Sequence, residues 1–265
     1  MIRLSPAVAL FLVLLLCTTG AGTQTPLSAT QQRIADIAAR SSCARTDWTQ
    51  RGFAPVGYIK GMALMYAKSL CESRGTPGPA AAVMKRPLMA GGEDALVRYR
   101  VDLSQNGVDV NNDIERLRAI YTLAIGEGMR ESSGNTTEGR DTTVKHPPPE
   151  TAEAGLFQQS FDSFGRSPIF AALFDQYKAN PAACLLDTFK EGIPRVVREP
   201  VVGDGRAAEF QTFTRECPAF ATEYAMILFR INQRHFGPVR RHEAQYIQRC
   251  NNMLKEVEAI VTCTP

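Results

Sequence analysis

The sequence predicts a mainly helical protein of the α+β class, with only a small amount of sheet. In three windows, 59–70, 117–129 and 220–231, apolar residues recur every three or four positions, the spacing that places them on one face of a helix. Segments rich in glycine and proline separate these windows, as turns and connectors do. We therefore expect helices joined by irregular segments, with a core built from the apolar helix faces.

The first residues have the pattern of an export signal. Arg3 precedes an apolar run over 7–17, and small residues follow at 19–22. This order is typical of a secretory signal peptide, which we assign to residues 1–22. The run is shorter than the ~20 apolar residues of a spanning helix. We expect no integral membrane segment after cleavage and a periplasmic or secreted protein.

The segment after the signal predicts a helical N-terminal extension over 23–110. A short helix is expected within 24–42, and a stronger one begins after Pro55 and ends at Gly75. The glycine- and proline-rich stretch 75–92 is predicted to be a loop. Residues 97–103 alternate as in a strand, although a short helix is also compatible with them.

The even number of cysteines after the signal predicts up to three disulfides, because exported proteins meet an oxidising compartment. The spacing favours no single pairing. If 241–261 is one helix, thirteen residues span about 20 Å, too far for Cys250 to bond Cys263. There is no Cys-x-x-Cys pattern, so no metal site is expected, and no cofactor. The cysteines are Cys43, Cys71, Cys184, Cys217, Cys250 and Cys263.

Charge is nearly balanced, with 30 Lys and Arg against 27 Asp and Glu, a net charge of +3. No basic tract with interleaved aromatic residues occurs, so nucleic acid is not expected as a partner. The slight positive balance is compatible with an anionic wall polymer. It does not specify an oligomeric state.

The helix predicted over 113–134 carries the first candidate catalytic residue. Asp113 follows two asparagines, which suits a helix N-cap, and Gly134 occupies the position where a left-handed residue commonly ends a helix. Glu131 then falls in the last turn, at the negative end of the helix dipole. That position disfavours a carboxylate, and apolar burial would act in the same direction. A raised pKa is what a general acid at neutral pH requires.

A polar connector and a helical C-terminal part follow. Pro147, Pro148 and Pro149 exclude a helix there and favour extended chain. Pro168 then opens a further helical stretch, and another begins at Cys217.

Glu-Ser-Ser-Gly at 131–134 and Gly-Leu-Phe-Gln-Gln-Ser at 155–160 resemble the lysozyme-like superfamily, which includes goose-type lysozymes and soluble lytic transglycosylases. The chain is also similar to a group of uncharacterised secreted rhizobial proteins that share Gly-Met-Arg-Glu-Ser-Ser-Gly. The resemblance implies a lysozyme-like catalytic domain over 111–265, with a small β-hairpin beside the cleft. Residues 138–143 are the candidates for one arm of that hairpin.

The resemblance further implies that Glu131 is the general acid that cleaves a β-1,4-linked amino-sugar polymer, with peptidoglycan as the expected partner. Gln158 would lie near the acid and hold the sugar or orient water, with a helix N-cap contact as the alternative. Ser133 and Tyr224 are further substrate-binding candidates. Hydroxyls beside a helix end more often act as caps. At Tyr224 the family's Ala-Tyr-Asn motif lacks its asparagine here, so core packing is the default.

A second carboxylate distinguishes the two possible outcomes of the reaction. An inverting hydrolase needs one roughly 6.5–9.5 Å from the acid to activate water. Asp141 is the first candidate, because goose-type lysozymes are similar in having an aspartate in this region; an ion pair with Arg140 or Lys145 is the alternative. Lytic transglycosylases use one acid only. Chitosanase- or chitinase-like cleavage, or a catalytically silent module that binds glycan or a secretion-system component, are the alternative functions.

Overall fold

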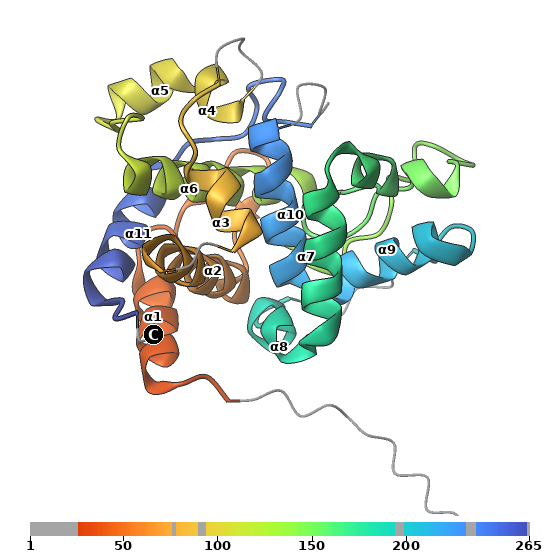
Figure 1. Cartoon of the computed structure of the whole chain (residues 1–265), viewed down its shortest axis with the longest axis horizontal. Coiled ribbons are helices and arrows are strands. Elements are labelled where there is room, and N and C mark those ends of the chain that lie inside the picture. Colours follow the sequence, from red (N-terminus) through yellow and green to blue (C-terminus); the bar gives the residue numbers. More distant parts are fainter. Residues whose placement is uncertain (1–25, 76–77, 90–93, 194–198, 232–236, 264–265) are drawn as a thin grey trace, which may run out of the picture.

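The computed structural model describes residues 26–75, 78–89, 94–193, 199–231 and 237–263, and the expected signal peptide lies outside them. The described chain is mainly helical, which confirms the predicted class (Figure 1). The α-helices are α1 (Ala29–Arg40), α2 (Val56–Arg74), α3 (Pro79–Lys85), α4 (Ala95–Arg98), α5 (Arg100–Gln105), α6 (Asp113–Ser132), α7 (Pro168–Ala179), α8 (Leu186–Lys190), α9 (Gly205–Glu216), α10 (Pro218–Ile231) and α11 (Gln248–Ile260). Short 3₁₀ turns are η1 (Pro149–Thr151), η2 (Phe161–Arg166) and η3 (Pro181–Cys184).

Helices α2, α6 and α10 form the centre of the molecule. Helix α2 packs against α1, α6 and α8, while α10 contacts α3, α6, α7 and α9 (Figure 1). Helix α11 returns to cover α1 and α6. One hydrophobic cluster runs from α1 to α11, so the chain on both sides of residue 110 shares a core. The domain boundary expected there stays a prediction.

Three disulfides join segments distant in sequence: Cys43–Cys250, Cys71–Cys263 and Cys184–Cys217. The first joins the bend after α1 to α11, and the second joins α2 to the segment after α11. The expectation that Cys250 does not bond Cys263 is confirmed. Disulfides that close such long loops reduce the entropy of the unfolded chain most. Their presence agrees with an exported protein.

The hairpin lies elsewhere than expected. Strands β1 (Asp47–Trp48) and β2 (Gly52–Phe53) pair antiparallel between α1 and α2. The prediction of a hairpin arm at 138–143 is wrong: within the described connector the chain makes turns and one isolated bridge, Ala154 to Gln159. The carboxylate of Asp141 accepts bonds from its own neighbourhood, at Thr143 N (2.8 Å) and Oγ1 (2.7 Å), which favours a turn over a strand.

Two further expectations are corrected. The predicted loop 75–92 contains α3, in which Pro79 occupies the first turn and the following alanines are strong helix formers. The helix expected over 241–261 begins only at Gln248, because the chain turns over 237–243 and His242 is left-handed (φ 61°). The open segment 97–103 is helical, in α4 and α5.

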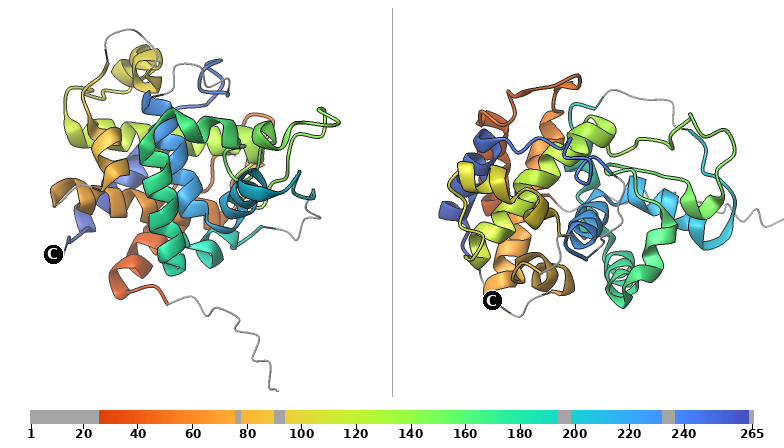
Figure 2. Two further views of the ribbon diagram at one scale, coloured as in Figure 1. Left: turned by 45° about the vertical axis from the view of Figure 1, so that its right-hand side comes forward. Right: turned by 90° about the horizontal axis from the view of Figure 1, so that it is seen from above.

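The connector lies along the chain that leads into α9 (Figure 2). Gln211 Nε2 of α9 donates to the Pro149 carbonyl over 3.2 Å. A Cβ on Gly203 would lie 2.4 Å from the Pro149 ring, so glycine permits this close approach. The connector is therefore held against the start and the first turns of α9.

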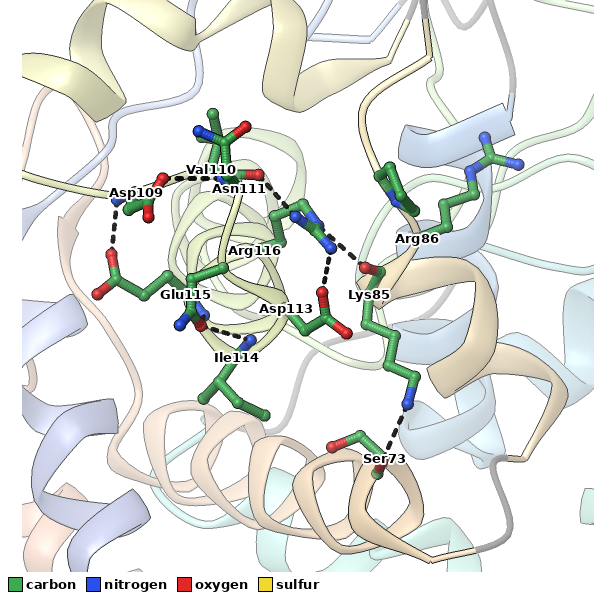
Figure 3. A network of polar contacts seen from close by, with 12 residues as sticks. Ser73, Lys85, Arg86, Asp109, Val110, Asn111, Asp113, Ile114, Glu115 and Arg116 are labelled. Carbon is green, nitrogen blue, oxygen red and sulfur yellow. Dashed lines mark hydrogen bonds and ion pairs between the residues drawn. The ribbon is translucent and has the colours of Figure 1, made fainter.

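The N-terminal end of α6 is held by a polar network (Figure 3). Asn112, rather than Asp113, is the N-cap: its side chain accepts from the backbone N–H groups of Ile114 (2.9 Å) and Glu115 (3.0 Å). Arg116 lies almost fully buried behind it, and its guanidinium donates to the carbonyls of Lys85 and Val110 and to Asp113. The start of the helix is therefore fixed to α3 and to the preceding loop.

No helix in the described part of the chain has both the length and the apolar character needed to cross a membrane.

Candidate functional site

A polar cleft lies at the C-terminal end of α6. It consists of two adjoining cavities that share four lining residues, Glu131, Asp141, Glu153 and Gln158. One cavity continues to Ser160, Asp162, Ser163, Arg166 and Arg241. The other continues to Arg51 of the β1–β2 turn, to residues 137–142 and to Glu199. The hairpin thus borders the cleft, although a different part of the chain forms it than the sequence predicted.

The last turn of α6 fixes the direction of Glu131. Ser133 (φ 55°) and Gly134 (φ 75°) both adopt left-handed backbone, and the Gly134 N–H donates to the Gly128 carbonyl over 3.1 Å, which ends the helix. The Ser132 hydroxyl lies 2.8 Å from the Leu156 carbonyl and so ties this turn to the Gly-Leu-Phe-Gln segment. Glu131 therefore projects from a rigid helix end.

A glycine lets α2 approach this helix end. A Cβ on Gly128 would lie 2.4 Å from the Tyr58 hydroxyl, which instead contacts the Ile125 carbonyl at 2.9 Å. Each such buried hydrogen bond contributes about 1 kcal/mol. The backbone that carries Glu131 is thereby anchored from the core side.

The half-buried carboxyl of Glu131 has a pKa raised to about 8. Burial is the largest cause, and the negative charge of Glu153 adds to it, while Arg241 and Arg51 act in the opposite direction. Among the described residues, this carboxyl has no hydrogen-bond or ion-pair partner. It is therefore protonated at neutral pH and accessible to a ligand in the cleft.

Glu153, which the sequence analysis did not single out, is the second carboxyl of interest. It is exposed within the cleft, yet surrounding protein and the charges of Asp141 and Asp162 raise its pKa to about 7. The available sequence signal was a carboxylate two residues before Gly155, in the polar connector.

Asp141 lies on the exposed rim of the same cleft as Glu131. Its bonds to Thr143 lower its pKa, so it is ionised. The Arg140 guanidinium donates to the Asp141 carbonyl (3.1 Å) and the Val144 carbonyl (2.8 Å). The structure therefore brings Asp141 into the cleft as a rim residue held in a local turn.

The three other predicted residues have different positions. Gln158 lines both cavities in left-handed backbone (φ 44°), and its amide donates to the Gly155 carbonyl over 3.1 Å within its own turn. Ser133 caps α6 and is not part of the lining of these two cavities. Tyr224 packs on Phe170 in the core, but its hydroxyl lies 2.8 Å from the Ser163 hydroxyl, one residue behind the cleft wall.

Glu127 lies one turn before Glu131 on the same helix face and is fully buried. Its pKa is raised well above the ordinary value, first by burial and then by Glu131, while the Val239 N–H that it accepts acts in the opposite direction. Glu131 therefore follows, one turn along α6, a second buried carboxyl whose neutral form is favoured.

Comparison with models of protein families, with curated proteins and with solved structures finds no match to this chain. The resemblance to the lysozyme-like superfamily stays a prediction from the sequence.

The arrangement combines a carboxylic acid, carboxylates and arginines around a polar cleft. Such a lining suits a ligand rich in hydroxyl and amide groups, with a proton donor aimed into it. Within the described ranges no cluster of three or more His, Cys, Asp or Glu side chains is arranged to hold a metal ion.

Proposed function

We propose that the protein cleaves the β-1,4-linked amino-sugar polymer of peptidoglycan, as a muramidase or a lytic transglycosylase, with Glu131 as the general acid. One observation carries the proposal: a half-buried carboxyl that has no hydrogen-bond or ion-pair partner among the described residues, and whose pKa is raised to about 8, opens into a polar cleft. The Glu-Ser-Ser-Gly and Gly-Leu-Phe-Gln motifs that border this cleft support the choice of substrate.

In this reaction Glu131 donates its proton to the glycosidic oxygen while the bond between that oxygen and the anomeric carbon breaks. The departing sugar leaves as an alcohol, so no alkoxide forms. Gln158 is the candidate to hold the sugar, because it lines both cavities beside Glu131. The anomeric carbon is then captured by water in a hydrolase or by the sugar's own hydroxyl in a transglycosylase.

The test is mass spectrometry of the products after incubating the purified mature protein with peptidoglycan. Glu131→Gln should lower the rate by about 10²–10⁴-fold, the usual contribution of a general acid. Glu209→Gln is the matched control, because Glu209 is exposed on α9 and pairs with Lys178. If Glu131→Gln and the control are equally active, the proposal fails.

Chitosan is a second candidate substrate, favoured by the acidic lining of the cleft. Asp141, Glu153 and Asp162 line one cavity together with the acid Glu131, and carboxylates suit the cationic glucosamine unit. Digesting chitosan and peptidoglycan side by side discriminates the two. Retained glycan binding with neither polymer cut would indicate a catalytically silent glycan-binding module.

A further inference from the structure

We propose that Glu153 is the catalytic base of this cleft, the carboxylate that activates water opposite Glu131. This inference rests on the proposed glycan cleavage and deepens it. It assigns the role that the sequence analysis gave first to Asp141, and it makes the enzyme an inverting hydrolase.

The carboxylates of the cleft differ in whether their oxygens already accept hydrogen bonds. Three of them line both cavities: Glu131, Asp141 and Glu153. Asp141 is engaged by the backbone and hydroxyl of Thr143. The carboxyls of Glu131 and Glu153 have no hydrogen-bond or ion-pair partner within the described ranges. A base must accept a proton from water, so its oxygens have to be available to that water.

Asp162 in the same cavity is also occupied, since its carboxylate accepts from the Ser160 hydroxyl over 2.7 Å.

The backbone that carries Glu153 is held more firmly than the backbone that carries Asp141. The backbone next to Glu153 forms the bridge between Ala154 and Gln159, with N···O distances of 3.0 and 3.1 Å. The Gln159 amide donates to the Ala221 carbonyl of α10 over 2.7 Å, which links the bridge to the central helix. Asp141 instead lies in an exposed turn of the connector. Acid–base catalysis needs positions fixed relative to the substrate, and Glu153 meets that requirement better.

The surroundings of Glu131 and Glu153 give the two carboxyls different pKa values. Glu153 faces Asp141 and Asp162, which raise its pKa, and Arg241, which lowers it. Glu131 faces Glu153, Arg241, Arg51 and Arg130. The negative charge of Glu153 raises the pKa of Glu131 to about 8, above the value of about 7 for Glu153, so a proton shared between the two carboxyls favours Glu131. Environments that separate two carboxyls in this way assign one as acid and the other as base.

The step balances as a hydrolysis. Glu153 takes a proton from water as the water oxygen bonds to the anomeric carbon. The bond from that carbon to the glycosidic oxygen breaks with its electron pair, and this oxygen takes the proton of Glu131. One water is consumed, and the proton returns from Glu153 to Glu131 through solvent.

The test compares Glu131→Gln, Glu153→Gln and Asp141→Asn on a defined soluble glycan, with kcat, KM and pH profile measured for each. Glu153→Gln should lower kcat by about 10²–10³-fold with little change in KM, and should abolish the acidic limb of the profile. Asp141→Asn should lower kcat at least tenfold less than Glu153→Gln does, and should move the acidic limb to lower pH, because Asp141 raises the pKa of Glu153.

Chemical rescue distinguishes a catalytic role of Glu153 from a structural one. With Glu153→Ala, added azide should restore turnover as a glycosyl azide, because azide attacks the anomeric carbon without needing a base. NMR of the wild-type product should show the inverted anomer.

The role of Glu153 would be overturned if Glu153→Gln kept the wild-type kcat and the acidic limb of the pH profile while Glu131→Gln was inactive. A retained anomer or anhydro products from the wild type would do the same. Full activity of Glu131→Gln would instead refute the glycan-cleaving function itself.

Discussion

The two ends of helix α6 differ in whether their polar side chains have bonding partners. At the N-terminal end Arg116, with a side chain only 4% exposed, donates to the Lys85 carbonyl (2.9 Å), the Val110 carbonyl (2.8 Å) and Asp113 (Figure 3). At the C-terminal end the carboxyl of Glu131 has no such partner among the described residues. One helix thus carries at its start a charge whose guanidinium nitrogens are all bonded, and at its end an acid without a partner among the described residues.

The paired end of α6 is suited to stabilise the fold, and the end that carries Glu131 is suited to function. Buried polar groups are normally hydrogen-bonded, because an unsatisfied one lowers stability. A titratable group that is half-buried, lies in a cleft and lacks a partner is therefore a candidate functional group.

The largest expected loss of stability comes from the paired end. Arg116→Ala removes a buried side chain and leaves the partly buried carbonyls of Lys85 and Val110 without this donor, and it should lower the free energy of unfolding by about 3 kcal/mol. Chemical denaturation measures this, with exposed Arg249→Ala as the control, expected to change it by less than about 0.5 kcal/mol. Activity per folded molecule should stay unchanged. A loss for Arg116→Ala no larger than for the control would remove the structural half of the contrast.

At the other end of α6, removing the ionisable group should raise the stability of the fold instead of lowering it, by an amount that depends on pH. The pKa of Glu131 is about 8 in the folded protein against an ordinary 4.5, so its contribution to stability is fully present below pH 4.5 and is lost as pH rises through 8. Glu131→Gln cannot ionise and should be more stable than wild type at pH 9, on the order of 2 kcal/mol. Thermal unfolding of both proteins at pH 5 and pH 9 measures the difference. A difference independent of pH would contradict the raised pKa.

The N-cap should contribute less. Asn112→Ala removes the acceptor of the Ile114 and Glu115 N–H groups and should cost about 1 kcal/mol. Urea denaturation measures it, and the catalytic rate should not change. An altered rate would mean that the two ends of the helix are coupled.

The smallest effect is expected at the C-terminal cap. Ser133 has φ 55°, a conformation that glycine adopts without strain, so Ser133→Gly should stabilise the fold by about 0.5 kcal/mol. Activity should be unchanged, because Ser133 lies outside the lining of the two cavities. A marked fall in kcat or rise in KM would restore Ser133 as a substrate-binding residue.

The sequence predicted what depends on local spacing. The apolar periodicity of α2, α6 and α10 located three central helices, and the position of Glu131 beside Gly134 indicated a raised pKa before the cleft was visible. Both signals lie within one or two helix turns, where side-chain directions follow from the helix itself.

The remaining features depend on contacts between distant segments. The pKa of Glu153 is raised by Asp141 and Asp162, which meet it only after the connector folds. The disulfide pairs and the place of the hairpin beside the cleft likewise depend on how α1, α2 and α11 pack. No periodicity in the connector could reveal these contacts.

The central claim is that α6 ends in a carboxylic acid that stays protonated at neutral pH. Its most direct test is NMR titration of the Glu131 carboxyl carbon in the labelled protein, with Glu131→Gln used to assign the signal. The account predicts a midpoint near 8, and a coupled inflection near 7 from Glu153. A midpoint near the ordinary 4.5 would contradict it, because Glu131 would then be ionised when an acid is needed.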